Sequence, residues 1–262
     1  TLRTAERCGA MLRNYSQIQE AVPGERGWRV TLTSDVSGRS VSTVHATTVV
    51  NATGPWSMRT AESLGAPASD VIGVKGSHIV LRRPERFGDD AIVIRSVCDD
   101  RPLWAVPWLG RILIGSTECA FRGDPRDARA TPAEVDDLFE SFQRFFPAAR
   151  STRGDILCAF AGVRPIIAQD GESENAMSRE HRVDVDIRQR LVTVSGGKLT
   201  TFRKMAEQTV DRVCALLGLD EIGLPTRASL RNEPLWPGLK RGEVHALEHV
   251  LHERGQLAGV ND

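Results

Sequence analysis

The segment LVTVSGGKLTTFRKMAEQTVDRVCALLG (residues 191–218) decides the fold. Residues 191–194 predict a short apolar strand, and the pair Gly196-Gly197 follows it directly. A long helical pattern then opens with Lys198 and two threonines. Helix N-termini expose unpaired N–H groups and carry a partial positive charge, so this glycine turn is suited to receive an anion.

Other interpretations of the same residues are less specific. The glycines could form only a tight strand-to-helix turn, with Thr200 or Ser195 as its cap. A P-loop is excluded, because Val192 stands where that motif needs glycine and Leu199 follows the lysine. The S-x-x-K pattern at 195–198 lacks the S-D-N and K-T-G partners of the penicillin-binding enzymes.

Composition places the chain among ordinary globular proteins. Its 262 residues include 34 Lys+Arg and 34 Asp+Glu, which excludes a global basic field for nucleic acid. Five cysteines without a C-x-x-C pair favour reduced thiols in a cytoplasmic compartment over a disulfide framework or a zinc site. No apolar run approaches the roughly 18 residues of a membrane span, and no signal peptide is visible.

Hydrophobic patterning predicts an α+β fold, in which a largely antiparallel sheet is flanked by helices. Strand-helix pieces at both ends indicate that part of an α/β domain accompanies this sheet. A capping box at Thr131-Pro-Ala-Glu134 starts an amphipathic helix. Strands are expected near 71–83, 91–97, 102–110, 111–118, 155–167, 181–186 and 191–194, with a hairpin around 35–38 and a buried strand in 47–54; helices are expected at 2–12, 56–64, 132–146, after Gly197 and at 242–254.

Three groups of side chains are candidates for chemistry. A guanidinium is a natural fork for phosphate, so Arg164 and Arg179 are candidate anion ligands, with surface ion pairs as the alternative. In strand 71–83, alternation places His78 on the opposite face from Lys75 and Ser77, as a structural group or as a proton acceptor. The H-x-x-E-H pattern at 245–249 has no third ligand, so we interpret it as a solvated helix face and expect no metal.

Six stretches in fixed order carry a resemblance to a known family. They are VVNATGPW (49–56), KGSHIVL (75–81), PLWAVPWLGRILIGSTE (102–118), GDP (123–125), GVRPII (162–167) and VSGGKLTTFRKMAE (194–207). Together they resemble the respiratory, aerobic-type FAD-dependent glycerol-3-phosphate dehydrogenases of the D-amino-acid-oxidase-like flavoprotein superfamily. The resemblance covers about residues 1–219.

The resemblance implies roles for individual residues. The first stretch matches the loop that lines FAD, and the last matches the turn that faces the isoalloxazine ring. The two arginines match the groups that hold the substrate phosphate, and the histidine lies near the substrate. The implied cofactor-binding residues are Asn51, Ala52, Thr53, Gly54, Gly196, Gly197, Lys198, Leu199 and Thr200; the implied substrate-binding residues are Arg164, Arg179, Lys198 and Thr200.

The family reaction oxidises sn-glycerol 3-phosphate at C2 to dihydroxyacetone phosphate. Hydride passes to FAD and the electrons then pass to the membrane quinone pool, so a peripheral association with the inner face of the cytoplasmic membrane is implied. A base must remove the hydroxyl proton, and His78 and Lys198 are both candidates.

The resemblance also implies an incomplete flavoprotein. The family's N-terminal G-x-G-x-x-G segment is not in this sequence, so we expect a fragment. We expect a partial FAD-binding domain in 1–70 and 187–219, a substrate-binding sheet domain in 71–186, and in 220–262 a linker with the start of a truncated helical domain. The alternatives are a non-catalytic remnant or phosphate-binding module without FAD, and a flavoenzyme for another hydroxy acid or amine.

Overall fold

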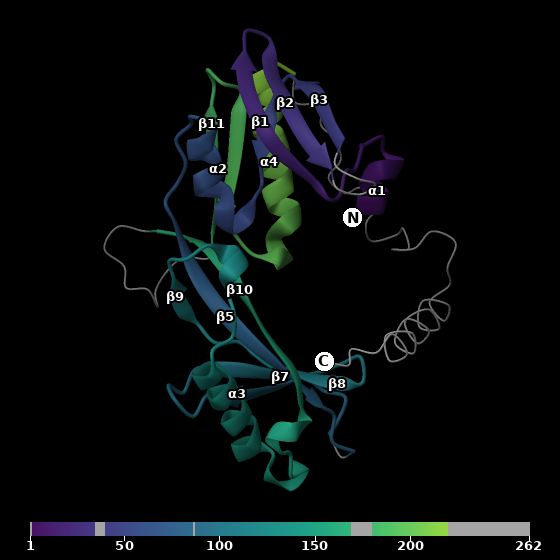
Figure 1. The fold of residues 1–262 in the computed structure, drawn as a ribbon, viewed down its shortest axis with the longest axis vertical. Coiled ribbons are helices and arrows are strands. Elements are labelled where there is room, and N and C mark those ends of the chain that lie inside the picture. The colour runs from purple at the N-terminus through teal and green to yellow at the C-terminus, as the bar shows by residue number, and fades with distance from the viewer. Residues whose placement is uncertain (1, 35–39, 86, 169–179, 220–262) are drawn as a thin grey trace. The chain divides into compact units, whose positions relative to one another are not determined.

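The computed structural model describes residues 2–34, 40–85, 87–168 and 180–219 (Figure 1). The chain divides into two compact units, one formed by 1–19, 31–42 and 221–262 and the other by 20–30 and 43–220. All elements from β4 to α4 belong to the second unit. That unit contains every predicted site residue that the structure describes.

A six-stranded sheet is the largest element of the second unit. Its strand order is β10-β5-β8-β7-β6, and β9 pairs with β5 at one end. All of these neighbours are antiparallel, as the sequence predicts. The strands are β5 (Val71–Arg82), β6 (Ile92–Arg95), β7 (Pro102–Trp108), β8 (Arg111–Gly115), β9 (Cys119–Phe121) and β10 (Ile156–Ile167).

Helix α3 (Pro132–Phe145) covers one face of this sheet (Figure 1). It begins at the predicted capping box, where the Thr131 hydroxyl accepts from the Glu134 amide at 3.3 Å and a Glu134 oxygen accepts from the Thr131 amide at 2.8 Å. One stripe of the helix packs on alternate residues of four strands. The main core side chains are Ile79, Leu81, Ile94, Leu103, Ile112, Ile114, Leu138, Phe139 and Phe142.

The other face of the sheet exposes aromatic side chains. Trp104, Gly115, His78 and Phe160 stand opposite one another in a single row across β7, β8, β5 and β10. The side chains of Lys75 and Ser77 are buried, whereas His78 is half-buried. The predicted alternation along β5 is therefore confirmed.

A three-stranded sheet of order β11-β12-β4 carries the segment that opened the sequence analysis. Strand β11 is antiparallel to β12, whereas β4 is parallel to it. Helices α2 and α4 pack against this sheet. The elements are β4 (Val49–Asn51), α2 (Ser57–Ser63), β11 (His181–Asp186), β12 (Leu191–Gly196) and α4 (Phe202–Leu217), with 3-10 turns η1 (Gly54–Trp56) and η6 (Leu199–Thr201) before the two helices.

Strands β1 (Ser16–Gly24), β2 (Gly27–Ser34) and β3 (Ser40–Ala46) form a third sheet. The sequence predicts the second and third strands but not the first, whose apolar alternation is weak. Helix α1 (Leu2–Arg7) is shorter than the predicted helix over 2–12. The difference arises at Gly9, because its φ of 95° is incompatible with continued helix.

The prediction that the strand in 47–54 is buried is only partly correct. Asn51 is buried, but the Val50 side chain is 44% exposed. The reason is that β4 lies at one end of its sheet, with β12 as its strand neighbour. The predicted boundary between 186 and 187 falls between the paired strands β11 and β12.

Membrane spans, metal clusters and the H-x-x-E-H pattern were also considered in the sequence. None of the helices in the described residues is long and apolar enough to cross a membrane. Within the same ranges, no cluster of three or more His, Cys, Asp or Glu side chains is arranged to hold a metal ion. The H-x-x-E-H pattern at 245–249 and the helix predicted at 242–254 lie outside the described residues.

Candidate functional site

Two of the predicted ligand-binding segments meet at one edge of the small sheet. Strand β4 pairs in parallel with β12, with Asn51 opposite Thr193. Since parallel strands end at the same edge, the turn after β4 and the turn after β12 lie close together. Crevices outside the carboxyl ends of parallel strands are common ligand sites in α/β sheets.

Asn51 shapes the first turn from within. The side chain is 2% exposed. Its amide nitrogen donates to the Ser57 carbonyl at 2.8 Å and more weakly to the Thr193 hydroxyl at 3.4 Å. Its amide oxygen accepts from the Thr53 hydroxyl at 2.7 Å and from the Thr53 backbone at 3.3 Å. These bonds occupy the amide, so Asn51 holds the loop in place while exposed Ala52 and Thr53 present the loop surface.

The turn after β12 needs both of its glycines. Gly196 and Gly197 have φ of 72° and 83°, a region that side-chain-bearing residues rarely adopt. A Cβ on Gly196 would come within 2.5 Å of the Glu180 carbonyl oxygen, and one on Gly197 within 2.5 Å of the Met205 sulfur. The turn itself therefore requires both glycines, which agrees with the less specific interpretation of this segment.

The residues after these glycines are exposed. Thr201 makes the capping bonds of the turn, because its hydroxyl donates to the Lys198 carbonyl at 3.0 Å and accepts from the Lys198 amide at 3.3 Å. The cap is thus neither Thr200 nor Ser195, and Ser195 instead donates to the Ser57 hydroxyl at 3.0 Å. Lys198, Thr200 and the 89%-exposed Leu199 project from this edge.

His78 lies on the exposed face of the large sheet, in contact with an aromatic ring. Its imidazole stacks on Phe160 with a centroid distance of 5.1 Å and an interplanar angle of 8°. On its other side stands Gly115, where a Cβ would collide with the imidazole. Burial, and next the nearby Arg164 cation, lower the pKa of His78 below its usual 6.5. The neutral imidazole is therefore favoured at neutral pH, which is the form that accepts a proton.

Arg164 lies on the same face as His78. Its guanidinium passes over Gly76, where any side chain would collide with it. One terminal nitrogen donates to the Ser116 hydroxyl, and the other approaches the Thr117 carbonyl at 3.4 Å. The structure thus brings Arg164 and His78 together on one sheet face, and their roles at a substrate site stay predictions. Arg179, the second predicted phosphate ligand, lies outside the described residues.

Sequence reasoning missed Ser116 and the gap that Gly115, which has no side chain, leaves beside the His78 ring. This gap is called the notch at Gly115. The notch lies between Trp104 and His78 because all three residues face one another across adjacent strands. The signal was the run Gly115-Ser116-Thr117 after an apolar strand, but its meaning depends on pairing with β5 and β7, which the sequence does not specify.

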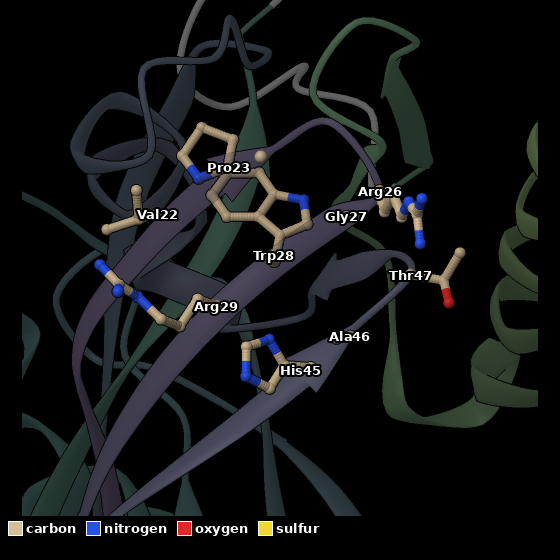
Figure 2. A pocket seen from close by; sticks show the side chains of 10 residues that line it. Val22, Pro23, Arg26, Gly27, Trp28, Arg29, His45, Ala46 and Thr47 are labelled. Carbon is tan, nitrogen blue, oxygen red and sulfur yellow. The ribbon is translucent and has the colours of Figure 1, made fainter.

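Two surface cavities lie within the second unit. One of about 400 Å³ is lined in part by Pro55, Met58 and Val163, and so adjoins Gly54 and Arg164 in the chain. The other, of about 410 Å³, is formed by the sheet of β1, β2 and β3 around Trp28 and His45 (Figure 2). The second cavity contains none of the predicted site residues.

Comparisons with known proteins identify the family of this chain and several similar proteins. The model of the family described as FAD dependent oxidoreductase matches residues 1–212. A glycerol-3-phosphate dehydrogenase from Synechocystis is 32% identical over 98% of this chain and 51% of its own length. A D-erythritol 1-phosphate dehydrogenase from Brucella abortus is 32% identical over 78% of this chain and 41% of its own length.

Among solved structures, a glycerol-3-phosphate dehydrogenase from Bacillus halodurans complexed with FAD superposes with a TM-score of 0.72 at 26% identity. The match covers 98% of this chain and 49% of that one. The chain therefore spans about half the length, or less, of these relatives.

Proposed function

Since the chain belongs to the family of FAD-dependent oxidoreductases, we propose that it carries part of the active site of an enzyme that oxidises sn-glycerol 3-phosphate to dihydroxyacetone phosphate. The observation that carries the proposal is that Arg164 and His78 lie close together on one exposed face of the sheet. A phosphate ester needs a cation, and oxidation of its alcohol needs a proton acceptor close by.

The residues at the edge of the small sheet fit a flavin. Gly54 has open space around it, and the residues that follow the Gly196-Gly197 turn are exposed at the same sheet edge. Leu199 offers an exposed apolar surface beside the Lys198 cation. Bound FAD would supply the two-electron oxidant, and a lysine there would stabilise negative charge on the reduced cofactor.

The chain's own side chains divide the remaining work. Arg164 binds the phosphate group and fixes the orientation of the substrate, with Ser116 holding one of its nitrogens. The neutral His78 imidazole accepts the proton of the substrate hydroxyl, and Lys198 is the second candidate for this role. Phe160 stacks on the imidazole and limits its rotation.

The domain assignment and the partners are part of the same proposal. Residues 1–70 with 187–219 form the flavin-binding part, and residues 71–186 form the substrate-binding part, whose last strand β11 pairs with β12 of the flavin-binding part. The electron acceptor is membrane quinone, reached by peripheral association with the membrane. The first relative's printed name supports glycerol 3-phosphate as substrate, and that of the Brucella relative supports the broader class of phosphorylated polyols.

The proposal is tested by adding FAD to the purified chain, removing free cofactor, and then adding glycerol 3-phosphate without oxygen. We expect visible flavin absorbance to remain with the protein and to bleach on addition of substrate. Retained flavin that does not bleach with glycerol 3-phosphate but does with D-erythritol 1-phosphate would move the assignment to the second polyol.

The same experiment distinguishes a flavoenzyme from the alternative, a phosphate-binding module without FAD. A chain that retains no flavin, yet binds glycerol 3-phosphate in calorimetry, would be a phosphate-ligand module. The variant Arg164→Gln is expected to weaken binding of glycerol 3-phosphate about ten- to hundredfold, since a hydrogen bond to a charged group contributes about 1.5–3 kcal/mol. Arg95→Gln is the matched control, because Arg95 forms an exposed ion pair with Asp100 on the same sheet.

A further inference from the structure

A cluster of four buried polar residues lies next to Arg164 and is not used by the proposed mechanism. It consists of Lys75, Ser77, Thr117 and Glu134, all of which are at most 9% exposed. The Lys75 ammonium donates to a Glu134 oxygen at 2.8 Å and to the Arg129 carbonyl at 3.0 Å. A buried ion pair is not a strong source of stability, because the desolvation of two charges offsets much of their attraction. A buried pair at this place therefore needs another explanation.

The second oxygen of Glu134 leads toward the substrate face. It accepts from the Thr117 hydroxyl at 3.0 Å. The same hydroxyl accepts from the Ser77 amide at 2.8 Å, and the Thr117 amide donates to the Ser77 carbonyl at 3.2 Å. Thr117 is thus fixed by both its side chain and its backbone.

Thr117 and its neighbour Ser116 in turn hold Arg164. The Thr117 carbonyl faces one guanidinium nitrogen at 3.4 Å, and the Ser116 hydroxyl accepts from the other. Lys75 lies on the α3 side of β5, whereas Arg164 lies on the His78 side. The segment 116–117 therefore links a buried carboxylate on one face of the sheet to an arginine on the opposite face through hydrogen bonds.

Helix capping alone does not account for Glu134. A capping box uses one carboxylate oxygen, as the equivalent pair Thr152 and Asp155 does elsewhere in the unit, with bonds of 2.8 and 3.0 Å. Glu134 makes the same bonds to Thr131 with one oxygen. Its other oxygen is directed to Thr117 and, at 3.5 Å, to the Cys119 thiol.

We propose that Glu134 and Thr117 are positioning residues that set the orientation of Arg164 toward the phosphate group of the substrate. The inference rests on the proposed function, in which Arg164 binds that phosphate. Neither residue touches the substrate. Their effect should therefore appear in discrimination between phosphorylated and unphosphorylated substrates and should disappear once Arg164 is removed.

The test measures the dissociation constant for glycerol 3-phosphate, and KM and kcat for glycerol 3-phosphate and for glycerol, in the FAD-loaded protein. Thr117→Val and Glu134→Gln are each expected to raise the dissociation constant and KM for glycerol 3-phosphate roughly tenfold, since displacing a binding group by about 1 Å can cost up to about 100-fold. The values for glycerol should change less than twofold. Thr117→Ser, which keeps the hydroxyl, is expected to restore wild-type values.

Double variants distinguish positioning from general loss of structure. In an Arg164→Gln background, Thr117→Val should add less than twofold to the dissociation constant, because the two residues act through one contact. Asp155→Asn, which removes the comparable capping bond without a link to Arg164, should leave both substrates unaffected.

Two kinds of failure are separable. If wild-type protein does not bind glycerol 3-phosphate, the proposed function and this inference both fall. If wild type binds it but Thr117→Val binds equally well, or loses glycerol and glycerol 3-phosphate alike, only the positioning role is overturned. If Thr117→Val protein does not fold, Glu134→Gln is judged by the same criteria at a temperature where circular dichroism shows it to be folded, because the loss of the Lys75 counter-charge lowers its stability.

Discussion

At the scale of single residues, the sequence identifies which side chains carry chemistry more readily than which small residues make room for them. The glycine-glycine-lysine turn, His78 and Arg164 were all visible as candidates, because cations and imidazoles have few structural uses in apolar strands. Gly76 and Gly115 gave no such signal. Their importance depends on the side chains of Arg164 and His78 that cross over them from neighbouring strands.

The notch at Gly115 gives a residue-scale prediction. Gly115→Ala should displace the His78 ring, because the added Cβ would collide with it. We expect kcat for glycerol 3-phosphate to fall about tenfold or more, while its dissociation constant changes little. Gly162→Ala on β10 is the control, since a Cβ there meets no atom within 4 Å. Equal losses in both variants would show that the space at Gly115 has no special role.

The lowered pKa of His78 gives a second prediction at the scale of single residues. Burial and the Arg164 cation lower this pKa below 6.5, so the proton-accepting form persists into mildly acidic solution. The acid limb of kcat/KM should lie below pH 6.5 and should move up toward 6.5 in Arg164→Gln, where the cation is absent. Rate measurements between pH 4.5 and 8 decide the matter. An acid limb that does not move in the variant would assign the proton acceptor to another group.

At the scale of elements, most strand and helix positions followed from the pattern, although β1 and β9 did not and α1 is shorter than predicted. The parallel pairing of β4 with β12 did not follow from the pattern either. About 140 residues separate Asn51 from its partner Thr193. Local periodicity carries no information about such distant partners. The resemblance to a family placed both turns at one ligand, and the structure provides the physical link through one sheet edge.

Helix α3 gives an element-scale prediction, since its first turn contains Glu134. Burial acts to raise the pKa of this carboxyl, but hydrogen bonds from Lys75, Thr131 and Thr117 together lower it to about 2. A folded pKa below the unfolded one stabilises the protein above about pH 4.5, and that stability is lost as the pH falls toward 2. Wild-type melting temperature should therefore fall steeply between pH 5 and 2.5, and that of Glu134→Gln less so.

At neutral pH the same variant should be less stable by about 3 kcal/mol, because it leaves the Lys75 ammonium buried without its counter-charge. Asp136→Asn is the control on the same helix, since its pair with Arg153 is exposed and should contribute less than about 1 kcal/mol. Urea denaturation of the three proteins measures both differences. Equal stabilities for both variants would mean that the buried pair contributes no more than a surface one.

At the scale of the whole molecule, the chain spans about half the length, or less, of the relatives described above. The described residues supply two turns at one sheet edge and an arginine beside a histidine. The affinity of this chain for flavin therefore depends on how much of the cofactor these two turns contact. The sequence indicated which turns are suited to face a ligand, while the geometry of these turns needed coordinates.

A ligand that binds only the folded chain raises its stability. FAD at 100 times its dissociation constant should add about 2.7 kcal/mol to the free energy of unfolding. For a chain of this size that corresponds to a rise in melting temperature of roughly 5–10 °C. Differential scanning calorimetry with FAD, and with adenosine monophosphate as the control, measures the shift. An unchanged melting temperature at saturating FAD would favour the binding module without flavin.

The row of residues across the large sheet has an optical consequence. Trp104 is 53% exposed and shares its row with His78, whereas Trp28 is 2% exposed in the third sheet. The indole of Trp104 should thus emit at longer wavelength than that of Trp28 and be quenched by dissolved iodide. Any molecule that covers the row would shield this indole and shift its emission to the blue. Because Trp108 on the same strand is 62% exposed and would emit in the same range, a Trp108→Phe background isolates this signal of occupancy.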